Sequence, residues 1–301
     1  MLPQSQNIST GKPISQGELQ KTFIAMLFAF AVSVVAQQIA EFLTVISSNW
    51  QHAIWPGEIY SHVHPYIWDF GAVASHSFLS LMMLSVSWVM WSKSKAAGHL
   101  KDIEEIFSIK FITFLIEVLL VTLYYSLSKS VEGDFAAYSK DKAIPAYFAS
   151  ISARPEAIQM FWIFIIFAVW DLIVDVIKSP KPRPIKGFFR KIGSVISGTV
   201  TYCAISLACS LGALGVYYAM PAQESAAQVI VGDVALVMLL LLFNRAKAWE
   251  HYIFSVFPSE RTRDNSKRTP TVGGNVLIAI LLLIFALCIL SITIIIPCLQ
   301  K

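Results

Sequence analysis

The sequence predicts an all-α integral membrane protein, a bundle of seven transmembrane helices with its N-terminus in the cytoplasm and its C-terminus outside. Composition is the first reason: of 301 residues, 56% are hydrophobic and 14% are charged, whereas soluble domains carry about 25% charged residues. The second reason is a set of long apolar stretches. The third is the uneven distribution of lysine and arginine along the chain.

The long apolar stretches give the predicted helices. A helix rises about 1.5 Å per residue, so a ~30 Å hydrocarbon core takes about 20 mainly apolar residues to cross. The fifth and seventh stretches carry no charge, whereas the others contain acidic residues. In chain order the predicted spans are 22–48, 66–92, 107–128, 156–177, 192–220, 226–244 and 275–297.

These spans make residues 22–298 a single transmembrane domain. Residues 1–21 are polar and lack the plan of a signal peptide, so we interpret them as a short cytoplasmic tail. In span 192–220, Ala208 and Gly212 stand four residues apart among many small side chains. Small residues allow close helix approach in lipid, so we expect this helix to pack centrally.

Basic residues set the predicted orientation. Eighteen of the 23 lysines and arginines fall in segments that are cytoplasmic if the N-terminus is inside, as the positive-inside rule requires. The formal net charge of +4 therefore reflects topology and gives no nucleic-acid-binding face in itself. We expect an inner membrane of the bacterial type, with the bilayer as the first partner and a homo-oligomer as a further one.

The ionisable groups inside the spans are the candidate functional residues. A charge at the bilayer centre costs from about 3 to more than 10 kcal/mol, so such groups face the bundle interior, stay protonated or bind cations. From the sequence, none of the acids has a lysine or arginine at similar depth. The candidates are Glu41, Asp69, His76, Glu117, Asp171, Asp175 and Asp233.

Depth arranges these candidates into a path. With the N-terminus inside, three acids lie in the outer third, His76 and Glu117 lie near the middle, and Asp171 and Asp175 lie in the inner third. This order predicts a cation-linked or proton-linked channel or transporter, with His76 and Glu117 as carriers. The structural alternative is that Asp69 and Asp233 reach the outer headgroups, Asp175 reaches Lys178, and Glu41 bonds to a neighbouring hydroxyl.

Asp171 and Asp175 also suggest an enzyme. At a spacing of four residues they share one helix face, where two carboxylates can hold Mg²⁺. The basic residues that follow would attract phosphates or anionic lipid headgroups. These basic residues are Lys181, Arg183, Lys186, Arg190 and Lys191.

This stretch resembles the first aspartate-rich motif of UbiA-type membrane prenyltransferases. The resemblance implies a magnesium-dependent enzyme acting on a prenyl phosphate. The chain departs from that family at Phe167 and Ala168, where the family has asparagine and aspartate, and it lacks a second aspartate-rich motif. The matching residues are Asp171, Asp175, Pro180, Arg183, Pro184 and Gly187.

Two further hypotheses remain open. The first outside loop offers histidines as ligands for Zn²⁺ or another cation, namely His52, His62 and His64. The basic inner loops would also suit a non-catalytic sensor or assembly subunit that binds a cytoplasmic partner. No organic cofactor is implied, and the chain has no Walker-type phosphate loop, HExxH or GxSxG motif.

Overall fold

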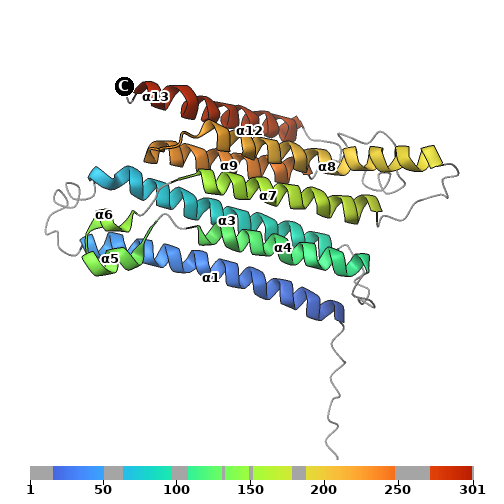
Figure 1. Cartoon of the computed structure of the whole chain (residues 1–301), viewed down its shortest axis with the longest axis horizontal. Helices are drawn as coiled ribbons and strands as arrows, with labels where there is room; N and C mark the ends of the chain where they lie inside the picture. The colour runs from blue at the N-terminus through green and yellow to red at the C-terminus, as the bar shows by residue number, and fades with distance from the viewer. Residues whose placement is uncertain are drawn as a thin grey trace, which may run out of the picture.

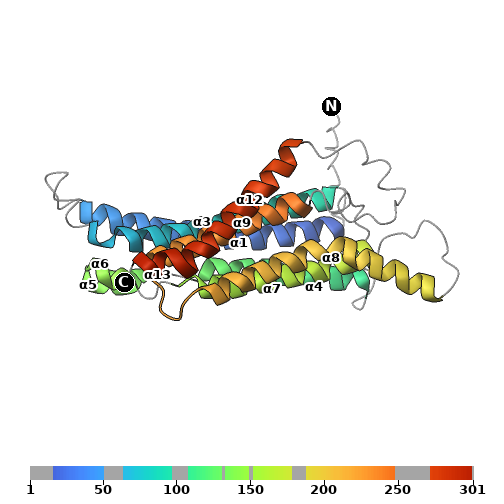
Figure 2. The same ribbon diagram turned by 90° about the horizontal axis from the view of Figure 1, so that it is seen from above.

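The structure, a computed structural model, is a bundle of long helices that run side by side (Figure 1). It describes residues 16–50, 64–96, 108–130, 133–148, 152–177, 188–247 and 272–299. Within these ranges seven helices are long and apolar enough to cross a membrane, so the predicted fold class is confirmed. The start of α1 and the end of α13 lie at opposite ends of the bundle (Figures 1 and 2), as an odd number of spans requires.

The helices follow the predicted spans closely. The main differences are that the first helix starts at Gln16, inside the predicted tail, and that the sixth continues to Lys247. The helices are α1 (Gln16–Trp50), α3 (Ile67–Ala96), α4 (Ile109–Lys129), α7 (Arg154–Asp171), α8 (Phe188–Ala219), α9 (Ala226–Lys247) and α12 (Val272–Leu290). Shorter elements are η1 (His64–Tyr66), α5 (Phe135–Asp141), α6 (Ile144–Tyr147), η2 (Leu172–Ile177), η3 (Ser291–Ile295) and α13 (Ile296–Leu299).

Helix α9 is the most buried of these spans and packs against α3, α8 and α12, while α7 packs against α4 and α8. Helix α8 packs closely against α9 at Gly212, as the small residues of this span predicted. A Cβ added at Gly212 would come within 2.9 Å of the Leu239 side chain. Helix α12 is the peripheral one: only 11% of its most apolar window is buried within the protein. Because that window is the most hydrophobic of the seven, we interpret its outer surface as the part that faces lipid.

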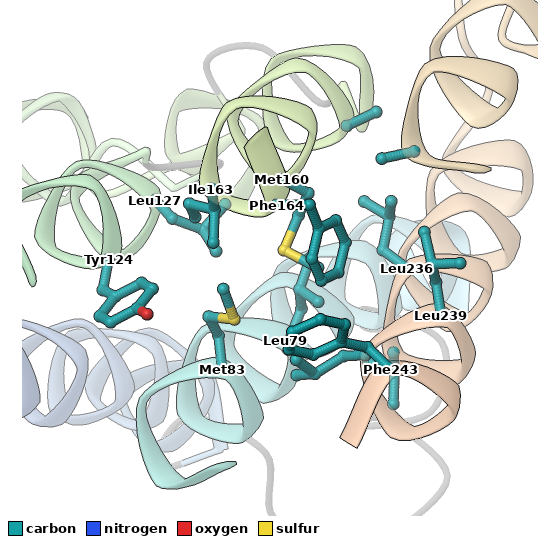
Figure 3. Packing of buried hydrophobic residues seen from close by; sticks show 14 of the residues in the cluster. Leu79, Met83, Tyr124, Leu127, Met160, Ile163, Phe164, Leu236, Leu239 and Phe243 are labelled. Atoms are coloured by element: carbon teal, nitrogen blue, oxygen red, sulfur yellow. The ribbon is translucent and has the colours of Figure 1, made fainter. Parts of the chain in front are cut away.

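The middle of the bundle is filled with apolar side chains (Figure 3). Leu79 and Met83 from α3 meet Phe164 from α7 and Phe243 from α9, and each of these is at most 1% exposed. The rings of Phe164 and Phe243 lie 5.0 Å apart between centroids. Dense packing of this kind holds helices together where lipid provides no hydrophobic driving force.

Helices α5 and α6 form an aromatic cap over the end of α1 and the start of α3. Asp134 caps α5 by accepting a hydrogen bond from the Ala137 N–H, at 2.8 Å, and Tyr138 hydrogen-bonds Ser48 of α1. Burial beside Glu41 raises the pKa of the Tyr147 hydroxyl to about 12. The cap packs around a second core of Val45, Phe70, Val73, Tyr138, Ile144 and Tyr147.

The substitution Gly133→Ala should loosen this cap. A Cβ at Gly133 would overlap the Tyr147 ring, and overpacking of this sort costs about 1–3 kcal/mol. Thermal unfolding in detergent should show a lower midpoint for the variant. Gly215→Ala is the matched control, because open space surrounds its Cβ position; equal midpoints for the two variants would contradict the packing described for the cap.

Candidate functional site

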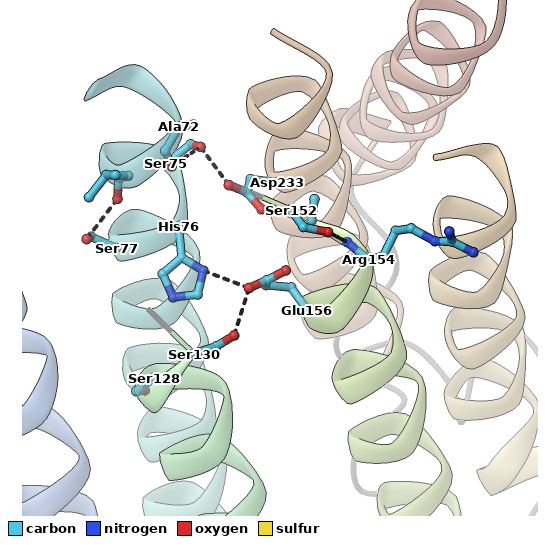
Figure 4. A network of polar contacts seen from close by, with 12 residues as sticks. Ala72, Ser75, His76, Ser77, Ser128, Ser130, Ser152, Arg154, Glu156 and Asp233 are labelled. Carbon is cyan, nitrogen blue, oxygen red and sulfur yellow. Dashed lines mark hydrogen bonds and ion pairs between the residues drawn. The ribbon is translucent and has the colours of Figure 1, made fainter. Parts of the chain in front are cut away.

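Three ionisable side chains meet inside the bundle, near the end that we call outer from the predicted orientation. They are His76 of α3, Glu156 of α7 and Asp233 of α9, and each is at most 2% exposed. We call them the outer cluster (Figure 4). Two of them, His76 and Asp233, were predicted as candidates from the sequence, whereas Glu156 was not.

The contacts of the outer cluster join four helices. The Nδ1 of His76 lies 3.2 Å from Oε1 of Glu156, as an ion-pair contact. The same Glu156 oxygen accepts a hydrogen bond from Ser130, at the end of α4, at 3.0 Å. Asp233 accepts a 2.6 Å hydrogen bond from Ser75, one residue before His76. The cluster therefore forms through tertiary packing between helices that lie far apart in the sequence.

The cluster contains buried atoms whose hydrogen-bonding capacity is unused. Nε2 of His76, Oε2 of Glu156 and Oδ1 of Asp233 are buried without a hydrogen-bond partner. Such groups normally have partners, because each unpaired one carries a desolvation cost. With the imidazole protonated and both carboxylates ionised, the cluster would carry one net negative charge in an apolar interior. Its composition therefore favours the uptake of a proton or another small cation.

The start of α7 places Glu156 at this depth. Pro155 occupies the first turn of the helix, where its fixed φ angle suits the helix and its missing N–H costs nothing. Glu156 follows in the same turn, where a negative charge interacts favourably with the helix dipole. Glu224, in the loop before α9, accepts hydrogen bonds from the Ala153 N–H at 2.7 Å and from the Ser152 hydroxyl at 2.8 Å.

Two charged groups lie beside the outer cluster. Burial raises the pKa of the Glu224 carboxyl, the hydrogen bonds from Ala153 and Ser152 lower it, and the nearby Glu156 raises it further. The guanidinium of Arg154 lies over the ring of Tyr217, at 4.5 Å from its centroid. This cation–π contact ties the start of α7 to the end of α8.

At the inner end, Glu117 is held by two tryptophans. Its Oε1 accepts from the indole N–H of Trp170 on α7 and its Oε2 accepts from that of Trp91 on α3, both at 3.4 Å. Glu117 is 4% exposed, so its predicted burial is confirmed. The indole donors were not predicted, because tryptophan near a span end is usually an interfacial anchor.

The inner end also contains a buried ion pair. Oδ2 of Asp171 lies 2.8 Å from Nζ of Lys247 and accepts a 2.8 Å hydrogen bond from Ser206 on α8. The Lys247 ammonium also donates to the Tyr202 carbonyl oxygen, at 2.5 Å. The expectation that no acid has a cation at similar depth is therefore wrong for Asp171. It failed because the predicted span ended at residue 244, whereas α9 continues to Lys247, whose long side chain reaches Asp171.

The remaining predicted site residues lie elsewhere. Glu41 accepts a 2.8 Å hydrogen bond from Gln37 within α1, and Asp69 is partly exposed near the start of α3. Asp175 lies in the π-helix η2, and the structure describes its backbone but not its side chain. The side chains of Arg190 and Lys191 are likewise not described. Five further predicted residues lie outside the described ranges altogether, namely His52, His62, Lys181, Arg183 and Lys186.

The metal hypotheses find no support among the described residues. These residues contain no group of three or more His, Cys, Asp or Glu side chains that could hold a metal ion. His64, at the start of η1, is exposed. At Asp171, the Lys247 ammonium lies against the oxygen that Mg²⁺ would need, and the two cations would repel each other there.

Helix α7 contributes one buried acid to each polar layer, Glu156 to the outer cluster and Asp171 to the inner end. Glu156 and Asp171 are fifteen residues apart, which is about 22 Å along a helix. His76 and Trp91 have the same spacing on α3. The structure therefore places the two predicted carriers, His76 and Glu117, in two separate layers, with the apolar core of Figure 3 between them.

Comparisons with protein-family models, with curated proteins and with solved structures find no match to this chain. The functional argument therefore rests on the geometry of the buried polar groups.

The Asp171–Lys247 pair gives a stability prediction. Removing one partner leaves a buried charge without compensation, which costs about 3–5 kcal/mol, whereas removing both costs much less. We expect Lys247→Met and Asp171→Leu each to lower resistance to denaturant strongly, and the double variant to recover most of the loss. Lys140→Met, at an exposed position in α5, is the control. Additive losses in the double variant would contradict a direct pair.

Glu224 gives a pH prediction. Its carboxyl has a raised pKa in the folded protein, so the folded state binds this proton more tightly than the unfolded chain does. The contribution of Glu224 to the free energy of unfolding should therefore fall as pH rises above its ordinary value of 4.5. In Glu224→Gln, thermal midpoints measured from pH 4 to pH 8 should lose this decrease. A variant with the wild-type pH profile would show that Glu224 does not cause it.

Proposed function

We propose that the protein is a proton-linked membrane transporter and that the outer cluster is its proton-binding site. The class is the one that the intramembrane acids predicted. The roles differ from the sequence prediction, because Glu156 and Asp233 join His76 at the site and Glu117 lies one layer further in. We place the protein, as part of the same proposal, in an inner membrane of the bacterial type.

One observation carries the proposal: a histidine and two carboxylates are buried together, and each has a polar atom without a hydrogen-bond partner. A structural cluster would normally be fully paired, because unpaired buried atoms cost free energy. Polar groups of this kind inside a membrane bundle mark ion pathways and proton relays. Histidine suits this task because its protonation changes within the physiological pH range.

The apolar layer supports a transporter over an open channel. Between the two polar layers, Leu79, Met83, Ile163 and Phe164 are at most 1% exposed. An open pore would need a continuous water column at this depth, whereas the side chains are close-packed here. A conformational change that separates them would expose the outer cluster to one side of the membrane at a time.

The rival functions are less well supported. A magnesium-dependent enzyme would use Asp171, whose Oδ2 is already bonded to Lys247 and Ser206. The basic segments were predicted to bind anionic lipid or a cytoplasmic partner. This stays a prediction, because the structure does not describe the side chains of these segments.

Proton flux into proteoliposomes under an imposed pH gradient tests the proposal. We expect the wild type to acidify the lumen, and Glu156→Gln and Asp233→Asn to reduce the rate by about 100-fold or more. Asp141→Asn, at an exposed position in α5, is the matched control and should keep the wild-type rate.

Two outcomes would contradict the proposal. One is a folded wild-type protein that gives no flux above empty liposomes under a gradient of either direction. The other is wild-type flux that persists in both Glu156→Gln and Asp233→Asn. In either case the outer cluster would be a structural feature of the bundle.

A further inference from the structure

Buried polar side chains follow one face of α3 through the apolar layer. The series is His76, Ser80, Ser87 and Trp91, with spacings of four, seven and four residues, which keep all four on one side of a helix. The two serines are buried, at 0% and 3% exposure. The series begins in the outer cluster and ends at the indole that donates to Glu117.

The hydroxyls on this face differ from ordinary helix serines. Ser77, also on α3, donates to the Val73 carbonyl oxygen at 2.9 Å, so its hydroxyl is satisfied within the helix. Ser80 Oγ is completely buried without a hydrogen-bond partner. Ser87 Oγ makes a weak 3.8 Å contact with Met83 Sδ and interacts with the Tyr124 hydroxyl of α4.

Tyr124, which interacts with Ser87, belongs to the same helix as Glu117. The two residues stand seven apart on α4, so they lie on the same side of that helix, and Tyr124 is 2% exposed. At the other end, Nε2 of His76 has no hydrogen-bond partner, and Figure 4 shows it turned away from Glu156. Unpaired or weakly paired polar atoms therefore stand at the outer end of the apolar layer and within it, and the Glu117 carboxylate lies at the inner end.

We propose that Ser80, Ser87 and Tyr124 line the proton path between the outer cluster and Glu117. Water molecules bound along this path would carry the proton between the hydroxyl groups. The inference rests on the proposed function, since it names the route by which that proton crosses the apolar layer. Ser80 and Ser87 are about 10 Å apart along the helix axis. When the conformational change separates the close-packed apolar side chains, a chain of about three water molecules would bridge this distance at ordinary hydrogen-bond lengths.

The transfer along this path balances without an oxidant or reductant. The His76 imidazolium gives the proton on Nε2 to the next oxygen, which releases its own proton to the oxygen after it. Each hydroxyl or water gains one O–H bond and loses another. The last oxygen protonates the Glu117 carboxylate, so one proton has moved inward and every intermediate group is restored.

The serine hydroxyls test the path directly. In the proteoliposome assay, Ser80→Ala and Ser87→Ala should each lower the proton flux by about 10-fold or more, because a break in the chain removes a donor and an acceptor. Ser77→Ala, which removes a hydroxyl bonded to its own helix, should keep the wild-type rate. Ser80→Thr keeps a hydroxyl and should recover most of the flux lost in Ser80→Ala.

Tyr124→Phe removes a hydroxyl and keeps the ring packing, so it tests the path even if a serine variant fails to fold. It should lower the flux and change the ratio of rates in H₂O and D₂O. Wild-type rates in Ser80→Ala, Ser87→Ala and Tyr124→Phe, in the same assay where Glu156→Gln is inactive, would overturn the path and leave the proposed function standing. No flux in the wild type would overturn both.

Discussion

A carboxylate buried in the hydrocarbon must find its partners on a neighbouring helix, and the arrangement of this bundle depends on that constraint. Glu156 bonds to groups from α3 and α4, and Asp171 bonds to groups from α8 and α9. Both acids lie on α7. A single helix therefore bonds to four neighbours through polar contacts near its two ends, whereas α12, which lies at the edge of the bundle, has no such groups.

The same constraint is met differently in the two polar layers. At the inner end, Asp171 is neutralised by Lys247, and both Glu117 oxygens accept from indole N–H groups. At the outer end, two acids share one imidazole, and three polar atoms have no hydrogen-bond partner. Hydrogen bonding thus differs between the layers: the inner acids bond to groups of neighbouring helices, whereas the outer cluster retains unused hydrogen-bonding capacity. In the proposed transport cycle, the outer cluster is therefore the layer that takes up the proton.

The sequence predicted the spans well because apolar length is a local property, and it predicted the burial of His76, Glu117, Asp171 and Asp233 for the same reason. It missed Glu156, because an acid in the first turn of a span is expected to lie at the membrane surface and not inside the bundle. It also missed Lys247, because a lysine three residues beyond the predicted end looks like an inside flank. Which acids meet was not predictable, since the contacts of His76 with Glu156 and of Asp171 with Lys247 depend on helix neighbours that one sequence does not specify.

Infrared spectroscopy of the carboxyl groups tests the central claim most directly, because it reports whether the outer cluster takes up a proton in the folded protein. A pH titration of the wild type in lipid should show a protonated carboxyl C=O band that appears and disappears reversibly, and that band should be lost or shifted in Glu156→Gln and in Asp233→Asn, with no change in Asp141→Asn. A titration in which the wild type and both cluster variants give the same bands at every pH would show that the outer cluster binds no proton, and would contradict the account.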